Sequence, residues 1–158
     1  MHHTHNTPNL EAWKLFLKAH AVVVGRLEQE LERERALPLT WYDVLLQLRG
    51  APNHRMRLQD LGAKLVISKS GLTRRIDRME AAGFVERREC AEDARGCFAE
   101  LTVDGEEALR AAGPVHLEGI EEHFSKHLSQ QEAEVLERAF RKILSQTSVD
   151  SPDAGGCD

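Results

Sequence analysis

Residues 57–102 read RLQDLGAKLVISKSGLTRRIDRMEAAGFVERRECAEDARGCFAELT, and this stretch decides the fold. Its first leucines recur at steps of three and four, which predicts a short helix over residues 58–65. A second helix is predicted over residues 68–82, with Ser68 or Ser70 as its N-cap and a glycine directly after its end. Two short helices joined by a tight turn are typical of a helix-turn-helix.

A hairpin follows these two helices. Residues 84–90 and 97–101 have the composition of strands, and residues 91–96 between them have the chemistry of a turn. Arg95 would stand at the tip of this hairpin.

The second helix carries most of the positive charge. Residues 64–78 hold five basic side chains against one acidic one, a local charge of +4, whereas the whole chain carries −5. A cationic helix on an acidic protein is the pattern expected where phosphate backbones dock. The alternative is a basic, solvated face on an ordinary helix.

The flanking segments predict further helices. Apolar residues recur at helical spacing over residues 10–35, which predicts a long amphipathic helix. A short helix is expected over residues 41–48, with Thr40 as its N-cap. Ser129-Gln-Gln-Glu132 is a capping box that opens a last helix. The predicted order is α-α-α-α-β-β-α-α: a mainly α fold with a small β-hairpin, in which the outer helices carry apolar stripes suited to pairing with a second subunit. Residues 1–9 and 147–158 are polar tails, expected to be disordered.

Composition narrows the function classes. The chain shows no apolar run long enough to cross a membrane and no signal-peptide pattern, and its three cysteines do not form a disulfide framework, so we expect no membrane partner and a reducing, cytoplasmic setting. It also lacks a nucleophile elbow and a phosphate-binding glycine loop, so we expect neither an enzyme nor a cofactor.

An ordered set of short motifs runs along the chain. The set is Asp43-Val-Leu45, Arg57-Leu-x-Asp-Leu61, Ser70-Gly-Leu-Thr-Arg74, Asp77-Arg-Met-Glu80, Gly83-Phe-Val85, Asp93-x-Arg95-Gly96 and Leu101-Thr-x-Asp-Gly105. In this order and spacing the set resembles the MarR family of dimeric winged-helix transcription regulators, and the resemblance extends over residues 10–145. It implies one winged-helix domain over residues 10–146, with a DNA-binding lobe at 40–101 and a dimer layer formed by 10–35 and 102–146.

The resemblance, together with the charge, implies where double-stranded DNA binds. The second helix of a helix-turn-helix lies in the major groove and presents the residues of its N-terminal half to base edges. Here those residues are Ser68, Lys69, Ser70, Thr73 and Arg74, while Arg75 and Arg78 serve phosphates or internal ion pairs.

The hairpin would then be the wing of the fold. Arg95 matches the tip arginine that enters or borders the minor groove, and Asp93 matches an acidic partner that orients an arginine. Arg87 and Arg88 at the base of the wing would support it and are candidates for phosphate contacts. The alternative is an ordinary turn with solvated charges.

Members of this family often bind a small anionic or phenolic ligand between the dimer helices and the DNA-binding lobe. The candidates for such a site here are Trp13, His20, Trp41, Tyr42, Asp43 and Arg75. Core aromatic residues and a helix cap are the alternative roles for the tryptophans and for Asp43.

Two other kinds of sensor are weighed. If the hairpin loop is 91–96, Cys90 and Cys97 face each other across the strands and could be redox-active; a register shift of one residue would place them on opposite faces. His116, His123 and His127 recur near one face of a helix, but without a third fixed ligand we assign no metal site and expect solvated or interface histidines.

The sequence therefore predicts a homodimeric DNA-binding regulator. We expect a repressor that binds a palindromic operator with half-sites about 34 Å apart and that a small ligand releases. The alternatives are a redox- or metal-sensing regulator of the same fold and a winged-helix module that binds proteins.

Overall fold

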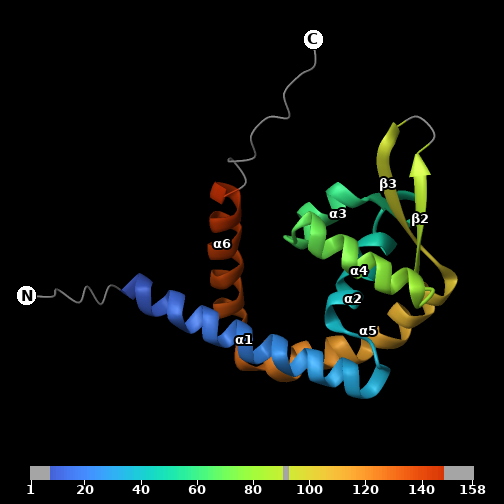
Figure 1. Cartoon of the computed structure of the whole chain (residues 1–158). Coiled ribbons are helices and arrows are strands. Elements are labelled where there is room, and N and C mark those ends of the chain that lie inside the picture. The colour runs from blue at the N-terminus through green and yellow to red at the C-terminus, as the bar shows by residue number, and fades with distance from the viewer. Residues whose placement is uncertain (1–7, 91–92, 148–158) are drawn as a thin grey trace, which may run out of the picture. The chain divides into compact units, whose positions relative to one another are not determined.

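The computed structural model describes residues 8–90 and 93–147, with side chains for residues 9–89 and 97–146. The chain divides into two compact units, residues 1–120 and 121–158. In chain order the elements are α1 Pro8–Arg35, α2 Leu39–Arg49, a 3-10 turn Pro52–His54, β1 Arg55–Arg57, α3 Leu58–Leu65, α4 Lys69–Ala81, β2 Val85–Cys90, β3 Asp93–Leu101, α5 Val103–His123, a 3-10 turn Ser125–His127 and α6 Gln130–Thr147 (Figure 1).

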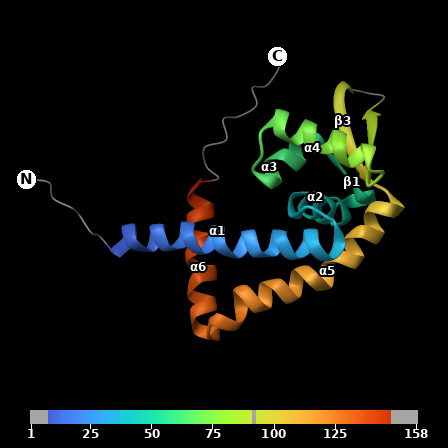
Figure 2. The ribbon, with the colours of Figure 1, turned by 60° about the horizontal axis from the view of Figure 1, so that its bottom comes forward.

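The core of the first unit gathers one apolar face from each helix. Leu27 and Leu31 of α1 pack with Val44, Leu45 and Leu48 of α2, and the cluster extends to α3, α4, β2, β3 and α5 through Leu61, Leu72, Ile76, Met79, Val85, Ala99, Leu109, Ala112 and Val115. Figures 1 and 2 draw the end of α1 beside α5, in agreement with this cluster. Burial of this shared core holds the small sheet against the helices.

The sheet has three antiparallel strands in the order β1-β3-β2. The sequence predicted β2 and β3 but not β1, a strand of three residues that is too short to show a periodicity. It pairs Arg55 with Glu100 and Arg57 with Phe98. The order of elements is therefore α-α-β-α-α-β-β-α-α rather than the predicted one.

The hairpin register corrects two predictions. β3 begins at Asp93, so the predicted loop over residues 91–96 is too long. The Cα partner of Cys97 is Glu89, and Cys90 pairs with Asp93 across an irregularity in the register. Because the partner of Cys97 is Glu89, the neighbour of Cys90, the two cysteines are not opposite each other. The prediction that they face each other across the strands is therefore wrong.

The helix ends agree with the sequence in most places. α3 has the predicted bounds, and Ser68 caps α4 by accepting a hydrogen bond from the backbone N–H of Gly71 at 3.2 Å. In the second unit, the predicted capping box opens α6: Ser129 N–H donates to Glu132 Oε2 at 2.8 Å, and Glu132 N–H donates to Ser129 Oγ at 3.3 Å. Thr40 is not a cap, because α2 begins at Leu39 after Pro38.

The segment that carries α4 and the hairpin is joined to α5 by a close backbone approach at Gly105. Thr102 Oγ1 donates to the carbonyl of Gly83 at 2.6 Å and accepts from the N–H of Gly105 at 3.0 Å. A Cβ atom on Gly105 would lie 2.1 Å from the carbonyl oxygen of Phe84, which is far inside van der Waals contact. Only glycine fits at this position.

We predict that Gly105→Ala lowers the unfolding free energy by about 3 kcal/mol or more, because the methyl group meets backbone that cannot turn aside. The matched control is Gly25→Ala inside α1, where no atom outside its own helix lies within 4 Å of the added Cβ. That variant should gain about 0.5–1 kcal/mol, since alanine favours the helix. Urea titration followed by circular dichroism measures both, and equal stabilities of the two variants would contradict the prediction.

Candidate nucleic-acid interface

α4 has one buried face and one exposed face. Leu72, Ile76 and Met79 are buried, and the residues on the other side, at steps of four, are Ser70, Arg74 and Arg78, all exposed. The preceding turn is made by Val66, whose φ of 52° is left-handed and redirects the chain from α3 into α4. A helix anchored along one stripe therefore presents hydroxyl and guanidinium groups outward.

The predicted DNA-contacting residues fall on this helix and its cap. Ser68, Lys69, Ser70, Thr73, Arg74 and Arg78 are exposed, and Arg75 is half-buried. The Thr73 hydroxyl donates to the carbonyl of Lys69 at 2.9 Å, so its oxygen is left to accept a hydrogen bond. The structure thus gathers six of the predicted residues on one accessible surface.

Arg75 is directed elsewhere. Its Nη1 donates to the carbonyl oxygen of Thr40 on α2 at 3.4 Å. Arg75 therefore lies toward the interior side of α4, whereas its neighbour Arg74 lies outward.

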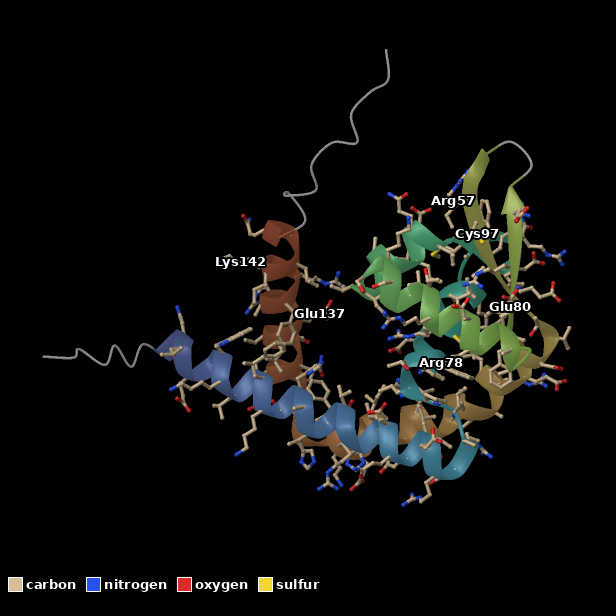
Figure 3. All side chains as sticks on the ribbon, in the orientation of Figure 1. Arg57, Arg78, Glu80, Cys97, Glu137 and Lys142 are labelled. Atoms are coloured by element: carbon tan, nitrogen blue, oxygen red, sulfur yellow. The ribbon has the colours of Figure 1, made fainter. Side chains whose placement is uncertain are left out.

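Arg87 connects the wing to α4. Its guanidinium pairs with Asp77 at 2.5 Å and with Glu80 at 3.2 Å, and it also donates to the carbonyl of Thr73 at 3.3 Å. Burial lowers the pKa of Arg87, but the hydrogen bond and charge of Asp77, with the charge of Glu80, raise it above its ordinary value. Figure 3 shows Glu80 on α4 facing the wing. These contacts give Arg87 a structural role between the two elements and leave its donors little capacity for a phosphate.

Among the remaining wing residues, the structure describes the side chain of Arg88. Arg88 pairs with Glu86 at 2.9 Å and with Glu100 at 3.3 Å on the exposed side of the sheet. The side chains of Cys90, Asp93 and Arg95 lie outside the described residues, so their predicted roles stay predictions.

The candidate ligand residues separate into two groups. Tyr42 and Asp43 of α2 lie with His116 of α5: the rings of Tyr42 and His116 have centroids 4.5 Å apart, and Asp43 interacts electrostatically with both His116 and Arg75. Trp13 and His20 lie on the exposed side of α1 and flank Phe16, while Trp41 packs edge-on against Phe84. The structure therefore assembles Tyr42, Asp43 and Arg75, without the other three candidates.

His116 is a member of this cluster that sequence reasoning did not assign to it. Its Nδ1 is buried and has no hydrogen-bond partner among the described residues. Burial lowers the pKa of His116, partly offset by the charge of Asp43, and burial raises the pKa of Asp43, offset by His116 and Arg75. The signal in the sequence was its place beside the buried positions Ala112 and Val115 of α5.

Two kinds of feature, a metal site and a membrane-spanning helix, are absent from the described residues. Within them, no group of three or more His, Cys, Asp or Glu side chains is arranged to hold a metal ion. None of the helices they form is long and apolar enough to span a membrane.

Comparisons with known proteins agree with this architecture. Residues 37–96 match the family model described as MarR family. The transcriptional repressor MprA of Escherichia coli K12 is 34% identical over 107 residues, which are 68% of this chain and 60% of MprA, so the chain spans less than two thirds of that relative.

Two solved structures match over most of their length. The crystal structure of AbsC, a MarR family transcriptional regulator from Streptomyces coelicolor, has 32% sequence identity and a TM-score of 0.84, covering 91% of this chain and 97% of AbsC. Sco3205, a MarR family regulator from the same organism in complex with DNA, has 27% identity and a TM-score of 0.84, covering 96% of this chain and 94% of its own. This chain belongs to the MarR family of transcriptional regulators.

Proposed function

We propose that this chain is a sequence-specific DNA-binding repressor that acts as a homodimer on a palindromic operator and is released by a small anionic or phenolic ligand. The observation that carries the proposal is the exposed surface of α4, where Ser70, Arg74 and Arg78 lie opposite a buried stripe. The similarity to Sco3205, which was crystallised with DNA, and to MprA, which is named a repressor, supports it.

The chemistry of α4 suits the major groove. A small Ser70 and a glycine at position 71 allow close approach, and Arg74 can donate two parallel hydrogen bonds to guanine. Asp77, one of the two acids of α4, pairs with Arg87. Its charge is therefore offset where phosphates would approach.

The homodimer is supported by apolar surface that each unit leaves exposed. On α1 these residues are Leu10, Trp13, Leu15, Phe16, Leu17 and Val22, and on α6 they are Val135, Phe140, Ile143 and Leu144. Trp13 is 54% exposed and Leu144 63%. Exposed apolar residues gathered along a helix are typical of an interaction surface, and a second copy of the chain would bury them. Two-fold symmetry then predicts the palindromic operator.

The ligand is proposed to bind beside Tyr42, Asp43, Arg75 and His116. This cluster combines a cation, a phenol, a half-buried carboxyl group and an imidazole nitrogen that has no partner among the described residues. An anionic or phenolic oxygen could replace Thr40 as the acceptor for Arg75. Because Arg75 belongs to α4, the ligand would act on the helix that reads DNA.

A redox-sensing alternative loses its geometric basis, because Cys97 is paired in register with Glu89. The protein-interaction module remains the competing function, and DNA binding separates it from the repressor. The deciding experiment is fluorescence anisotropy against DNA upstream of the protein's own gene, over a salt series. Tight binding that weakens steeply with salt and exceeds binding to scrambled DNA supports a specific regulator. Failure to bind unrelated DNA even at low salt would favour the interaction module.

We predict that Arg74→Ala loses about 1–3 kcal/mol of discrimination between the preferred site and scrambled DNA, because it removes a base-edge contact. The control is Arg110→Ala, an equally exposed arginine on α5. Anisotropy titrations with both duplexes give the ratio of affinities. An unchanged ratio for Arg74→Ala beside a discriminating parent would refute its role.

Trp13→Glu should convert the dimer to a monomer, because a carboxylate would be buried in the apolar interface. The control is Lys18→Glu, an exposed position of the same helix outside the apolar stripe. Light scattering coupled to size exclusion gives the mass of each variant. A Trp13→Glu protein that keeps the parental dimer mass would exclude this face from the interface.

His116 should make the protein less stable in mild acid. Its pKa is lowered in the folded state, so the unfolded chain binds more protons as pH falls through the ordinary value of 6.5. The free energy of unfolding should therefore decrease below that pH. The raised pKa of Asp43 acts in the opposite direction, at lower pH.

Urea titrations across the pH range, on the parent and on His116→Gln, measure this effect. Replacement of the imidazole should flatten the decline below pH 6.5, because the amide does not titrate. Asp43→Asn is the control from the same cluster and should keep the histidine-dependent decline. Parallel profiles for the parent and His116→Gln would contradict the assignment.

A further inference from the structure

A hollow of about 610 Å³ lies between α3, the first turns of α4 and β3. Leu58 and Leu72 are among the apolar side chains that line it, while Arg57, Lys69 and Thr73 contribute polar groups. Two of its lining residues are cationic and, among the described residues, none is acidic. Figure 3 shows Arg57 and Cys97, which also line it, close together beside β3.

Arg57 is held at the edge of this hollow by an aromatic ring. It is the last residue of β1 and is paired with Phe98 of β3. Its Cζ lies 4.8 Å from the centroid of the Phe98 ring, within the range of a cation–π interaction. Arg57 is exposed, and the ring contact restricts the positions that its guanidinium adopts.

The position of the hollow indicates what it receives. If α4 lies in the major groove and the β2–β3 wing lies at the minor groove, the DNA strand that separates these grooves crosses between α4 and β3. This part of the DNA presents phosphates rather than base edges. The hollow lies between the same two elements, with Lys69 on the α4 side and Arg57 on the sheet side.

We propose that this hollow seats one backbone phosphate of bound DNA, that Arg57 is a phosphate contact outside the recognition helix and wing tip, and that Phe98 positions Arg57. The inference rests on the proposed DNA-binding function and adds to it a contact that anchors the strand between the two reading elements. Such a contact sets register and affinity but carries no sequence information.

Arg55 offers a matched control within the same strand. It is exposed and lies over the same ring, with its Cζ 5.6 Å from the Phe98 centroid. Arg55 and Arg57 both line a second hollow, of about 340 Å³, which also contains the acidic Asp60. Arg55 and Arg57 thus share residue type, strand face and aromatic partner, but only Arg57 lines the hollow between α4 and β3.

The test compares the salt dependence of DNA binding for the parent, Arg57→Gln and Arg55→Gln. Because a phosphate contact is independent of sequence, a mixed-sequence duplex of about 30 base pairs is a sufficient probe and no operator is needed. Arg57→Gln should reduce the log-affinity against log-salt slope by about 0.9 per bound subunit. Arg55→Gln should leave the slope within error of the parent.

A double-mutant cycle tests the role of Phe98. Phe98→Leu should weaken binding in the parent while keeping the salt slope, since the charge remains but is no longer held in place. In the Arg57→Gln background the same change should have no further effect on affinity, because there is no guanidinium left to position. Equal losses in both backgrounds would show that Phe98 acts through the fold and would overturn its positioning role.

The outcomes separate this inference from the proposed function. A parent that does not bind the duplex at low salt removes the proposed function and the phosphate seat together. A parent that binds with a steep slope that Arg57→Gln leaves unchanged, or that Arg55→Gln reduces equally, overturns the seat alone. Binding of inorganic phosphate, measured at constant ionic strength, tests whether the hollow is instead a site for the free anion. If Arg57→Gln loses phosphate binding while its DNA binding is unchanged, the proposal is overturned.

Discussion

The contact between Arg87 and the two acids of α4 connects the small sheet to the helix that presents Arg74 and Arg78 outward. Arg87 projects from β2, pairs with Asp77 and Glu80, and donates to the carbonyl of Thr73. It therefore fixes the base of the wing to the middle of the recognition helix. If α4 binds the major groove and the β2–β3 wing binds the minor groove, both can bind at once only when the distance between them is fixed. The contacts of Arg87 hold that distance. They also offset two negative charges on the helix that is proposed to approach DNA phosphates.

A second junction connects this lobe to α5. α4 ends at Ala81, Gly83 follows with a φ of 82°, and the N–H of Phe84 returns to the carbonyl of Met79 at 3.0 Å. Thr102 then bonds to both Gly83 and Gly105. The end of the recognition helix, the base of the wing and the start of α5 thus meet within a few residues. A shift of α5 would be felt at the end of α4, because the backbone at Gly105 has no space to absorb it.

The sequence predicted the parts of this fold that depend on local physics. The bounds of α3, the Ser68 cap and the capping box at Ser129 follow from apolar spacing and side-chain hydrogen bonds between residues three positions apart. The predictions that were wrong depended on tertiary partners. Thr40 has the chemistry of a cap, but Pro38 starts α2 earlier and the Thr40 carbonyl bonds to Arg75 instead. β1 exists because β3 offers it an edge, and Cys97 pairs with Glu89 in a hairpin register that composition does not encode.

In the candidate site, too, the features set by local pattern could be predicted, and those set by tertiary packing could not. An exposed helix face can be read from a sequence, so Ser70, Arg74 and Arg78 could be named together. Which way an arginine on the border of that face turns depends on what packs beside it. Arg75 reaches α2, and His116 joins Tyr42 because α5 packs against α2. Neither contact has a signature in the local pattern, since the residues are far apart in the chain.

Adjacent arginines on α4 therefore belong to two different surfaces. Arg74 lies on the proposed DNA-reading face, and Arg75 lies in the cluster proposed to receive a ligand. One helix carries both, so if the proposed ligand shifts α4 as it draws Arg75 away from Thr40, Arg74 moves with it. Coupling between two binding sites is reciprocal: the factor by which the ligand weakens DNA binding equals the factor by which DNA weakens ligand binding. Under the proposed function, α4 would be both the element that contacts the operator and the element that the ligand contacts, so the coupling would need no other moving element.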